Sequence, residues 1–429
     1  MNIWYFHHYA TPYELPGLHR PFEFGEYFNK QGHKTTVFTS SYLHYASSNM
    51  IDDRSKYLLK EYDGINTVFI KTCGYENSGS KRVINMFQFA VRLSKIAKEY
   101  AKKNDKPDVI IASSPHPFTM LAGLKIAKRF GVPCICEVRD FWPEVFFYGG
   151  KLKEKSILGK MLLCGERYIY TKADGITFLK EGDHTYIQEK GWDIEHGGKI
   201  NMDKCIYVNN GVDIKLYDKR VNEFVFDDTD FDEDKFTVVY CGTIRPVNNV
   251  DLILDTAKLL GDEYRFLIFG TGNCVDALRK RINDEQINNV MLKGYVDNRL
   301  IPSILSHSSL NLLNYSGLSY NWSRGNSSNK LFEYLASGKP VLSTVKMGYD
   351  IIEKYNCGLS VEHTTPSEIA EEIRKIKKLD SNDYLDLCKN ARCAAEEFDI
   401  PKLSDKYLDE INRIVKNYNL KNKTKRRKK

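Results

Sequence analysis

The 429-residue sequence lacks any apolar run approaching the ~18 to 20 residues that cross a bilayer. No basic segment precedes its first apolar stretch, Ile3 to Phe6, so a secretory signal peptide is not expected either. Its ten cysteines are scattered and form no Cys-x-x-Cys pair, which argues against zinc ribbons and thioredoxin-like redox motifs. We therefore expect a cytosolic protein with reduced thiols.

Metal-ligand patterns are also scarce. The histidines show no spacing, relative to cysteine or glutamate, that suits a structural zinc site. Asp228 and Asp230 form an Asp-x-Asp pattern, but they lie in a charged segment ahead of a predicted strand, where a solvated linker is the simpler interpretation. We predict no essential metal and no cofactor.

The chain also lacks an excess of positive charge outside its C-terminal tail. The formal net charge is +7, but eight lysines and arginines between Lys416 and Lys429 have no acid among them, so the rest of the chain carries 7 − 8 = −1. Nucleic acid is therefore not an expected partner. With 42% hydrophobic residues the chain is too apolar for a disordered protein, and its length favours two domains.

Strands alternate with helices throughout most of the sequence, which predicts doubly wound parallel sheets. The alternation stops in the charged, strand-poor segment 213–234 and resumes with a strand at Phe236. We therefore predict an acceptor-side Rossmann-like domain at 1–215 and a nucleotide-sugar-binding Rossmann-like domain at 216–398, facing a cleft. A helix at 399–418 is expected to pack back on the first domain, followed by a basic tail at 419–429.

The densest candidate site is the block from Ser323 to Pro340, in which a polar loop precedes one short helix and a Gly338 stop. An N-cap at Asn326 or Ser327 would leave free backbone amides and a positive dipole end for a phosphate. Helical spacing places Lys330 and Glu333 on one face, as a cation for diphosphate and a carboxylate for hydroxyls. An ordinary capped surface helix with an ion pair fits the same residues.

This block resembles the P-N-K-x-F-E-Y-M-A-x-G-x-P-V signature of retaining glycosyltransferases of family 4, which have two Rossmann-like domains in the GT-B fold. Ser328 replaces the proline and Leu335 the methionine. The stretch from Glu137 to Pro143 is similar to an E-V-R-D-L-W-P segment of the branch that builds bacterial O-antigen and capsular polysaccharide. Further likeness lies in the loop around Gly17, the segment ending at His116 and the turns at 241–245 and 269–272.

The resemblance implies a glycosyltransferase, transferring a hexose or N-acetylhexosamine with retention from a nucleotide-diphosphate donor to a lipid-diphosphate-linked acceptor. It implies three catalytic residues, namely His116, Arg245 and Lys330. The implied donor-binding residues are Gly17, Gly242, Arg245, Gly270, Ser327, Ser328, Asn329, Lys330 and Glu333. The implied acceptor-side residues are Arg20, Glu137, Arg139 and Asp140.

Two further positions depart from the family pattern. The family's paired glutamates stand eight residues apart, so the first would fall at Gly325, and Ser327, Ser328 or loop amides must take over its role. The family's usual donor-site lysine falls near Asn248 or Asn249, which leaves the diphosphate charge to Arg245 and Lys330. Neither the donor sugar nor its base follows from the sequence.

Other interpretations stay open. A nucleotide-sugar epimerase shares the architecture, and a non-catalytic sugar-nucleotide-binding partner would tolerate Gly325. The Gly270-Thr-Gly272 turn also resembles a dinucleotide fingerprint, although its third position is Val275. Lysines interleaved with apolar residues at 151–163, together with the basic tail, favour a peripheral location on an anionic membrane at its cytoplasmic face. A helix packed on the sheet with solvated lysines would give the same pattern.

Overall fold

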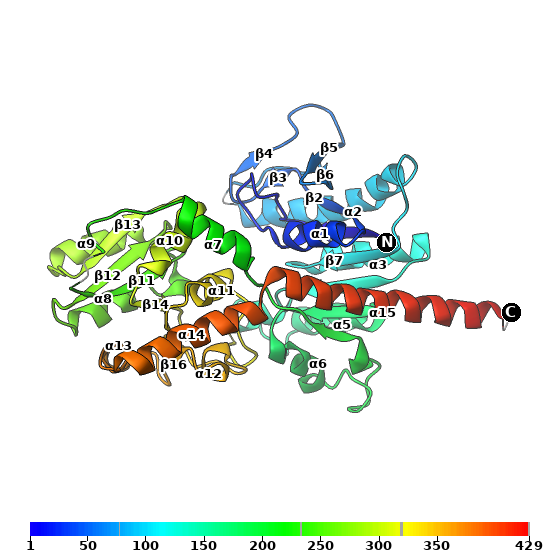
Figure 1. Ribbon diagram of the computed structural model, residues 1–429. Helices are drawn as coiled ribbons and strands as arrows, with labels where there is room; N and C mark the ends of the chain where they lie inside the picture. The colour runs from blue at the N-terminus through cyan, green and yellow to red at the C-terminus, as the bar shows by residue number, and fades with distance from the viewer. Residues whose placement is uncertain (77, 232–233, 318–320, 428–429) are drawn as a thin grey trace. The chain divides into compact units, whose positions relative to one another are not determined.

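The computed structural model describes residues 1–429 except 77, 232–233, 318–320 and 428–429, with side chains described up to Thr424. The chain divides into two compact units. Unit 1 comprises Met1–Leu179, Asp183–Val208 and Leu403–Lys429, and unit 2 comprises Lys180–Gly182 and Asn209–Lys402. Each unit is built on a mainly parallel sheet covered by helices, as predicted from the alternating pattern (Figure 1).

Unit 1 is built on an eight-stranded sheet in the order β10-β9-β8-β7-β1-β2-β6-β5. Its strands are β1 (Asn2–His7), β2 (Lys34–Ser40), β5 (Tyr57–Tyr62), β6 (Ile65–Ile70), β7 (Val109–Ser113), β8 (Cys134–Val138), β9 (Gly175–Phe178) and β10 (Cys205–Tyr207). A separate ribbon pairs β3 (Tyr42–Leu43) with β4 (Ser48–Asn49). Successive parallel strands carry their carboxyl ends to one edge, which brings the residues after β1, β7 and β8 together.

The edge strand β5 pairs antiparallel with β6, and the sequence analysis did not predict it. The two strands are joined by Asp63 and Gly64, both with left-handed backbone (φ 48° and 74°). An Asp-Gly pair between two strands is the usual signal of a two-residue hairpin turn, because such turns need positive φ at both positions.

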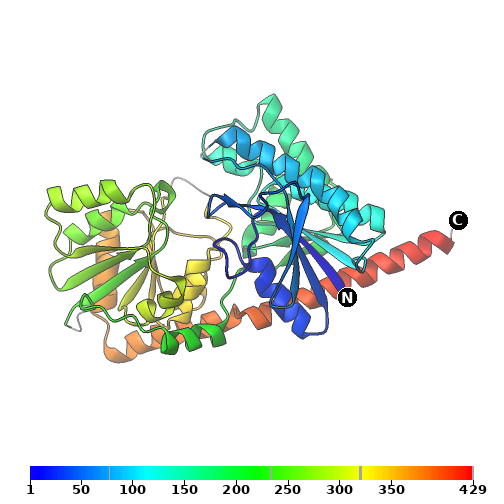
Figure 2. The same ribbon diagram turned by 90° about the horizontal axis from the view of Figure 1, so that it is seen from above.

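Helices cover both faces of this sheet (Figure 2). They are α1 (Arg20–Lys30), α2 (Gly79–Tyr100), α3 (Pro117–Phe130), α4 (Glu144–Tyr148), α5 (Ile157–Lys172), α6 (Thr185–Glu189) and α15 (Ile400–Arg427). Trp4 and Phe6 of β1 share a core cluster with Phe89 of α2. The rings of Phe24 in α1 and Tyr407 in α15 lie 5.7 Å apart, so the last helix contributes to the unit 1 core.

Unit 2 contains a six-stranded, wholly parallel sheet in the order β13-β12-β11-β14-β15-β16. The strands are β11 (Phe236–Cys241), β12 (Tyr264–Phe269), β13 (Val290–Gly294), β14 (Leu310–Leu313), β15 (Val341–Ser343) and β16 (Gly358–Ser360). The helices are α7 (Ile214–Glu223), α8 (Asp251–Lys258), α9 (Val275–Asp284), α10 (Ile301–Ser306), α11 (Asn329–Ala336), α12 (Ile351–Lys354), α13 (Pro366–Lys377) and α14 (Ser381–Glu397).

The charged, strand-poor segment contains a helix that the sequence analysis did not predict, α7, over residues 214–223. The Asp213 carboxylate caps this helix by accepting a hydrogen bond from the Leu216 amide at 2.9 Å. Farther along, Asp228 and Asp230 both contact the Lys293 ammonium, at 2.6 and 2.7 Å. The two carboxylates therefore have a protein cation as partner in this fold.

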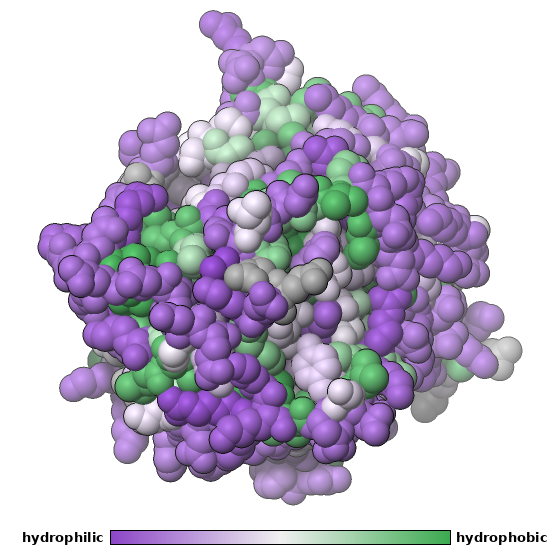
Figure 3. Space-filling view, turned by 60° about the vertical axis from the view of Figure 1, so that its left-hand side comes forward, coloured by the Kyte–Doolittle hydropathy of each residue, from purple (hydrophilic) through white to green (hydrophobic). Residues whose placement is uncertain are grey.

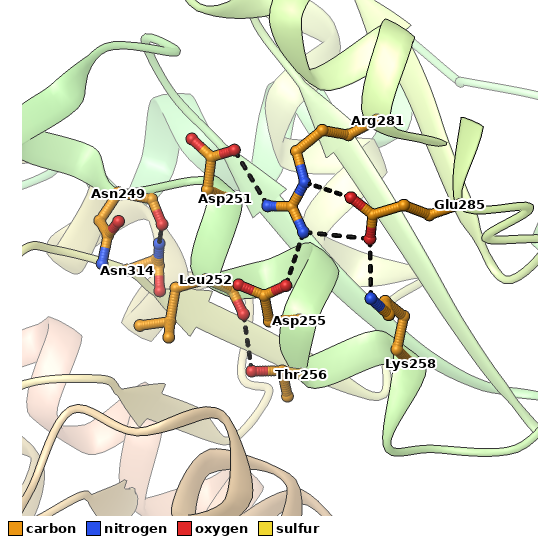
Figure 4. A network of polar contacts seen from close by, with 9 residues as sticks. All are labelled: Asn249, Asp251, Leu252, Asp255, Thr256, Lys258, Arg281, Glu285 and Asn314. Carbon is orange, nitrogen blue, oxygen red and sulfur yellow. Dashed lines mark hydrogen bonds and ion pairs between the residues drawn. The ribbon is translucent and has the colours of Figure 1, made fainter. Parts of the chain in front are cut away.

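A guanidinium fastens α9 to α8 (Figure 4). Arg281 on α9 contacts Asp251 at 3.1 Å and Asp255 at 2.6 Å on α8, and also Glu285 at 2.8 Å. Lys258 joins the same cluster through Glu285 at 2.7 Å. The ion pairs hold α8 and α9 together beside β12, whose carboxyl end contributes to the candidate site.

Within the described residues, no helix is both long and apolar enough to cross a membrane. On the face of the molecule in Figure 3, hydrophilic side chains predominate and the hydrophobic areas are small and separated.

Candidate active site

Two glycine turns lie at the carboxyl ends of the central strands of unit 2. Gly242 follows β11 and Gly270 follows β12. A Cβ on Gly270 would lie 1.9 Å from the Gly242 carbonyl oxygen, so the two turns pack with backbone alone. A Cβ on Gly242 would lie 3.6 Å from the Lys330 ammonium. The bare backbone of these turns thus lies beside a cation, as binding of a diphosphate requires.

The Lys330 ammonium is the central feature of this site. Its Nζ atom is buried and has no hydrogen-bond partner among the described residues. It lies 4.3 Å from the centroid of the Tyr315 ring and 4.8 Å from that of Tyr240. Burial, with a smaller effect of the positive charge of Arg245, lowers the Lys330 pKa to about 7. A buried ammonium that contacts ring faces and has no hydrogen-bond partner among the described residues is suited to bind an anionic ligand.

Helix α11 begins at Asn329, and its N-cap is Ser328, one residue after Ser327 and two after Asn326, the two caps considered in the sequence analysis. The Asn326 side chain instead accepts a hydrogen bond from the Ser328 amide at 2.8 Å. The Tyr315 hydroxyl donates to the Ser328 hydroxyl oxygen at 2.7 Å, which fixes the ring beneath Lys330. Gly325 has φ +100°, and this left-handed backbone delays the start of the helix.

Two asparagine side chains hold the loop before α11 by donating hydrogen bonds to its carbonyl groups. Asn209 donates to the carbonyl of Asn326 at 3.1 Å and Asn210 to that of Ser327 at 2.6 Å. Asn329 is exposed at the first helical position. The predicted donor-site residues Ser327, Ser328 and Asn329 therefore lie together at the amino end of the helix that carries Lys330.

Glu333 lies one turn after Lys330 and is partly buried. Its negative charge adds to burial in raising the pKa values of the Cys241 thiol and the Tyr217 hydroxyl, which places the carboxylate near the end of β11. Arg245 is exposed just after the first glycine turn. The structure thus brings the predicted donor-site residues between 242 and 333 together in one region of unit 2.

Two residues of the family pattern are missing from this chain, and the local structure differs at both positions. A glutamate at 325 would strain the backbone, because φ there is +100°. Asn248 donates to the Thr243 carbonyl oxygen, and its own carbonyl accepts from Asn314 at 2.6 Å. Figure 4 shows Asn314 donating likewise to Asn249. These asparagines fasten the turn after β11, where the family carries a lysine.

Arg20 and Glu137, predicted on the acceptor side, contact each other in the structure. They form a buried ion pair at 2.9 Å, with exposed fractions of 3% and 0%. Glu137 also accepts from Tyr5 at 2.8 Å and from Ser113 at 2.7 Å, while Arg20 donates to the Val208 carbonyl at 2.8 Å. These contacts hold β1, β7, β8 and α1 together, so the pair has a structural role.

His116 is the N-cap residue of α3, directly after the carboxyl end of β7. Its Nε2 lies 2.6 Å from Nδ1 of His8, a residue that the sequence analysis did not select. Burial lowers the His116 pKa to about 3, so the ring is neutral at physiological pH. The signal for His8 was its place just after the first strand, at the edge where ligand residues gather.

The remaining acceptor-side residues, Arg139 and Asp140, follow β8, whereas Gly17 of the predicted donor set lies in the loop after β1 in unit 1. Arg139 is partly buried, and its Nη1 atom has no hydrogen-bond partner within the described part of the chain. Asp140 beside it is also partly buried. A Cβ on Gly17 would lie 2.1 Å from the Thr11 hydroxyl oxygen, so this loop position admits no side chain.

The Lys330 pKa makes ligand binding depend on pH. If a diphosphate binds to the protonated ammonium, its affinity should hold at pH 7 and below and fall by up to about tenfold per pH unit above it. Titrating UDP between pH 7 and 9 measures this. Lys330→Arg, which stays charged, should flatten the profile. A flat profile in the unmodified protein would separate Lys330 from the ligand.

Two family models match the chain in succession. The model described as glycosyltransferase family 4 matches residues 22–216, and that of glycosyl transferases group 1 matches residues 221–394. A search of curated proteins found no match.

Solved structures share the fold at low identity. HepE from Anabaena, in complex with UDP, is 13% identical with a TM-score of 0.67, covering 96% of this chain and all of its own. Sucrose-phosphate synthase from Thermosynechococcus elongatus is 14% identical with a TM-score of 0.69, covering 96% and 98%. WaaG, a glycosyltransferase involved in lipopolysaccharide biosynthesis, is 14% identical with a TM-score of 0.63, covering 95% and 98%. The chain is thus a glycosyltransferase of the GT-B fold, with a family 4-like domain followed by a group 1 domain.

Proposed function

We propose that this glycosyltransferase moves a hexose or N-acetylhexosamine from a nucleotide-diphosphate donor to a lipid-diphosphate-linked glycan, with retention of anomeric configuration. The observation that carries the donor side is the buried Lys330 ammonium beside the glycine turns of β11 and β12, which has no hydrogen-bond partner in the described part of the chain. The similarity of residues 137–143 to the polysaccharide-building branch supports O-antigen or capsule synthesis as the process.

In this proposal the protein contributes mainly position and charge. Lys330, Arg245 and the amides that begin α11 neutralise the departing nucleotide diphosphate. Glu333 holds the nucleotide ribose. His116, kept neutral by burial, orients a hydroxyl of the sugar or the acceptor, and Arg139 with Asp140 shapes the acceptor side. No divalent metal is needed, because protein cations carry the charge compensation.

The proposed location is the cytoplasmic face of the cell membrane, without a spanning helix. Ile157, Leu158 and Met161 of α5 are 90%, 49% and 61% exposed, close to the lysines of segment 151–160. Apolar side chains among lysines favour an anionic bilayer surface. The basic tail adds charge, although residues 425–429 lie outside the described side chains.

Glu333→Gln should weaken binding of the intact nucleotide by about 10- to 100-fold without unfolding the protein, because a charge-assisted hydrogen bond is lost. Arg245→Ala should weaken binding of a nucleoside diphosphate more than that of its nucleoside. Calorimetric titration with UDP and uridine measures both effects. Equal losses for the two ligands in Arg245→Ala would contradict its phosphate role.

Incubation with a panel of nucleotide sugars, with and without a lipid-linked acceptor, tests the reaction itself. Acceptor-dependent transfer is expected. Isomerisation of the donor without acceptor would show an epimerase of the same fold. Binding without turnover under every condition would indicate a non-catalytic partner.

A further inference from the structure

A cationic pocket of about 430 Å³ lies in unit 1, apart from the residues assigned to the donor and acceptor. It is formed by the segment before β5, the residue after β6 and one side of α2. Five cations line it, namely Arg54, Lys56, Lys71, Arg92 and Lys95. Among the described residues that line the pocket there is no carboxylate.

The hydrogen bonds within the pocket leave its charge largely uncompensated. Lys71 donates to the Asp53 carbonyl and Arg92 to the Lys71 carbonyl, both neutral acceptors. The neighbouring Asp53 carboxylate accepts from the Ser55 amide at 2.9 Å and the Ser55 hydroxyl at 2.8 Å. These bonds, with a smaller effect of Lys71, lower the Asp53 pKa. Among the described residues, none of the five cations that line the pocket forms an ion pair with a carboxylate.

The same helix carries an exposed apolar row beside the pocket. Val83, Ile84, Phe87 and Val91 of α2 are 52%, 51%, 59% and 56% exposed. Their spacing places them on one side of the helix, and Lys95 continues the row one turn after Val91. A helix that is apolar along an exposed stripe and basic at its end is typical of surfaces that lie in the interface of a bilayer.

We propose that this pocket binds the phosphate group of an anionic phospholipid while the apolar row of α2 enters the membrane interface. Arginine and lysine converging on one point suit a phosphate oxyanion. Free phosphate has the same chemistry, but only a lipid also gives the exposed apolar row a partner. The site lies outside the α5 segment and the tail of the proposed function, and it does not require sugar transfer.

Sedimentation of the full chain with vesicles tests the inference, using phosphatidylcholine with and without 30% phosphatidylglycerol. Lys56→Glu/Lys95→Glu should reduce binding to the anionic vesicles at least tenfold. Lys102→Glu/Lys106→Glu, an equal charge change at exposed positions of unit 1 outside the pocket, should have a much smaller effect. Ile84→Ser/Val91→Ser should weaken binding without altering its salt dependence.

Equal losses of vesicle binding in the two charge variants would overturn the proposed lipid site, because they would indicate a general electrostatic attraction instead. A pocket titrated by inorganic phosphate but indifferent to vesicles would show a soluble phosphate ligand and overturn the lipid assignment. Transfer to a soluble acceptor analogue should persist in the pocket variant. Absence of transfer in the unmodified protein would count against the proposed function and not against this site.

Discussion

Lys330→Met should lower the affinity for nucleoside diphosphate by about 100-fold and stabilise the ligand-free protein. The affinity falls because the diphosphate loses a charge-assisted contact from a buried donor, worth ~3 kcal/mol. The stability rises because folding then buries a thioether in place of an ammonium that has no hydrogen-bond partner among the described residues. Calorimetry with UDP, GDP, ADP and dTDP, and thermal unfolding without ligand, measure the two effects.

Lys339→Met is the matched control, since it removes one positive charge from the same unit after α11 ends. It should change neither quantity appreciably. A Lys330→Met protein that is less stable and binds every nucleotide normally would assign this lysine a structural role instead.

Glu137→Gln should destabilise unit 1 by about 3 to 5 kcal/mol, because it leaves the Arg20 guanidinium buried without its counter-charge. Although burial alone would raise it, the arginines and the hydrogen bonds lower the Glu137 pKa to about 2. The stabilising contribution is therefore complete above the ordinary carboxyl pKa and is lost as the pH falls from about 4.5 to about 2. Unfolding measured between pH 3 and 7 tests both statements.

Glu61→Gln, at an exposed position of β5, provides the control and should leave stability nearly unchanged. An acceptor-binding role for Glu137 would instead give a normal unfolding curve with a raised KM for the acceptor. That result would favour the acceptor-side prediction over a structural role for Glu137.

The fold was predictable because its signals are local. Alternating apolar segments and glycine stops marked the central strands of both units, and the structure places β1 and β11 within a few residues of the predicted positions. Helix α7 was missed because its charged sequence leaves only Tyr217 buried. The hairpin of β5 and β6 was missed although Asp63-Gly64 carries its turn signal.

The site was predictable where the residues are neighbours in the sequence. Ser328, Lys330 and Glu333 are ordered by one helix, so spacing alone brings them together. Arg20 and Glu137 are 117 positions apart, and only the folded sheet shows that they neutralise each other. The contact of His8 with His116 spans 108 positions and is likewise set by the strand order.

Proton uptake on nucleotide binding tests the central claim most directly. At pH 8 a Lys330 ammonium with a pKa of about 7 is mostly neutral in the free protein and becomes charged when a diphosphate binds. UDP titrations in buffers of different ionisation enthalpy should therefore show uptake of about one proton per bound UDP. Lys330→Arg should bind UDP with no such uptake. Tight binding without proton uptake in the unmodified protein would contradict the assignment of Lys330 to the donor diphosphate.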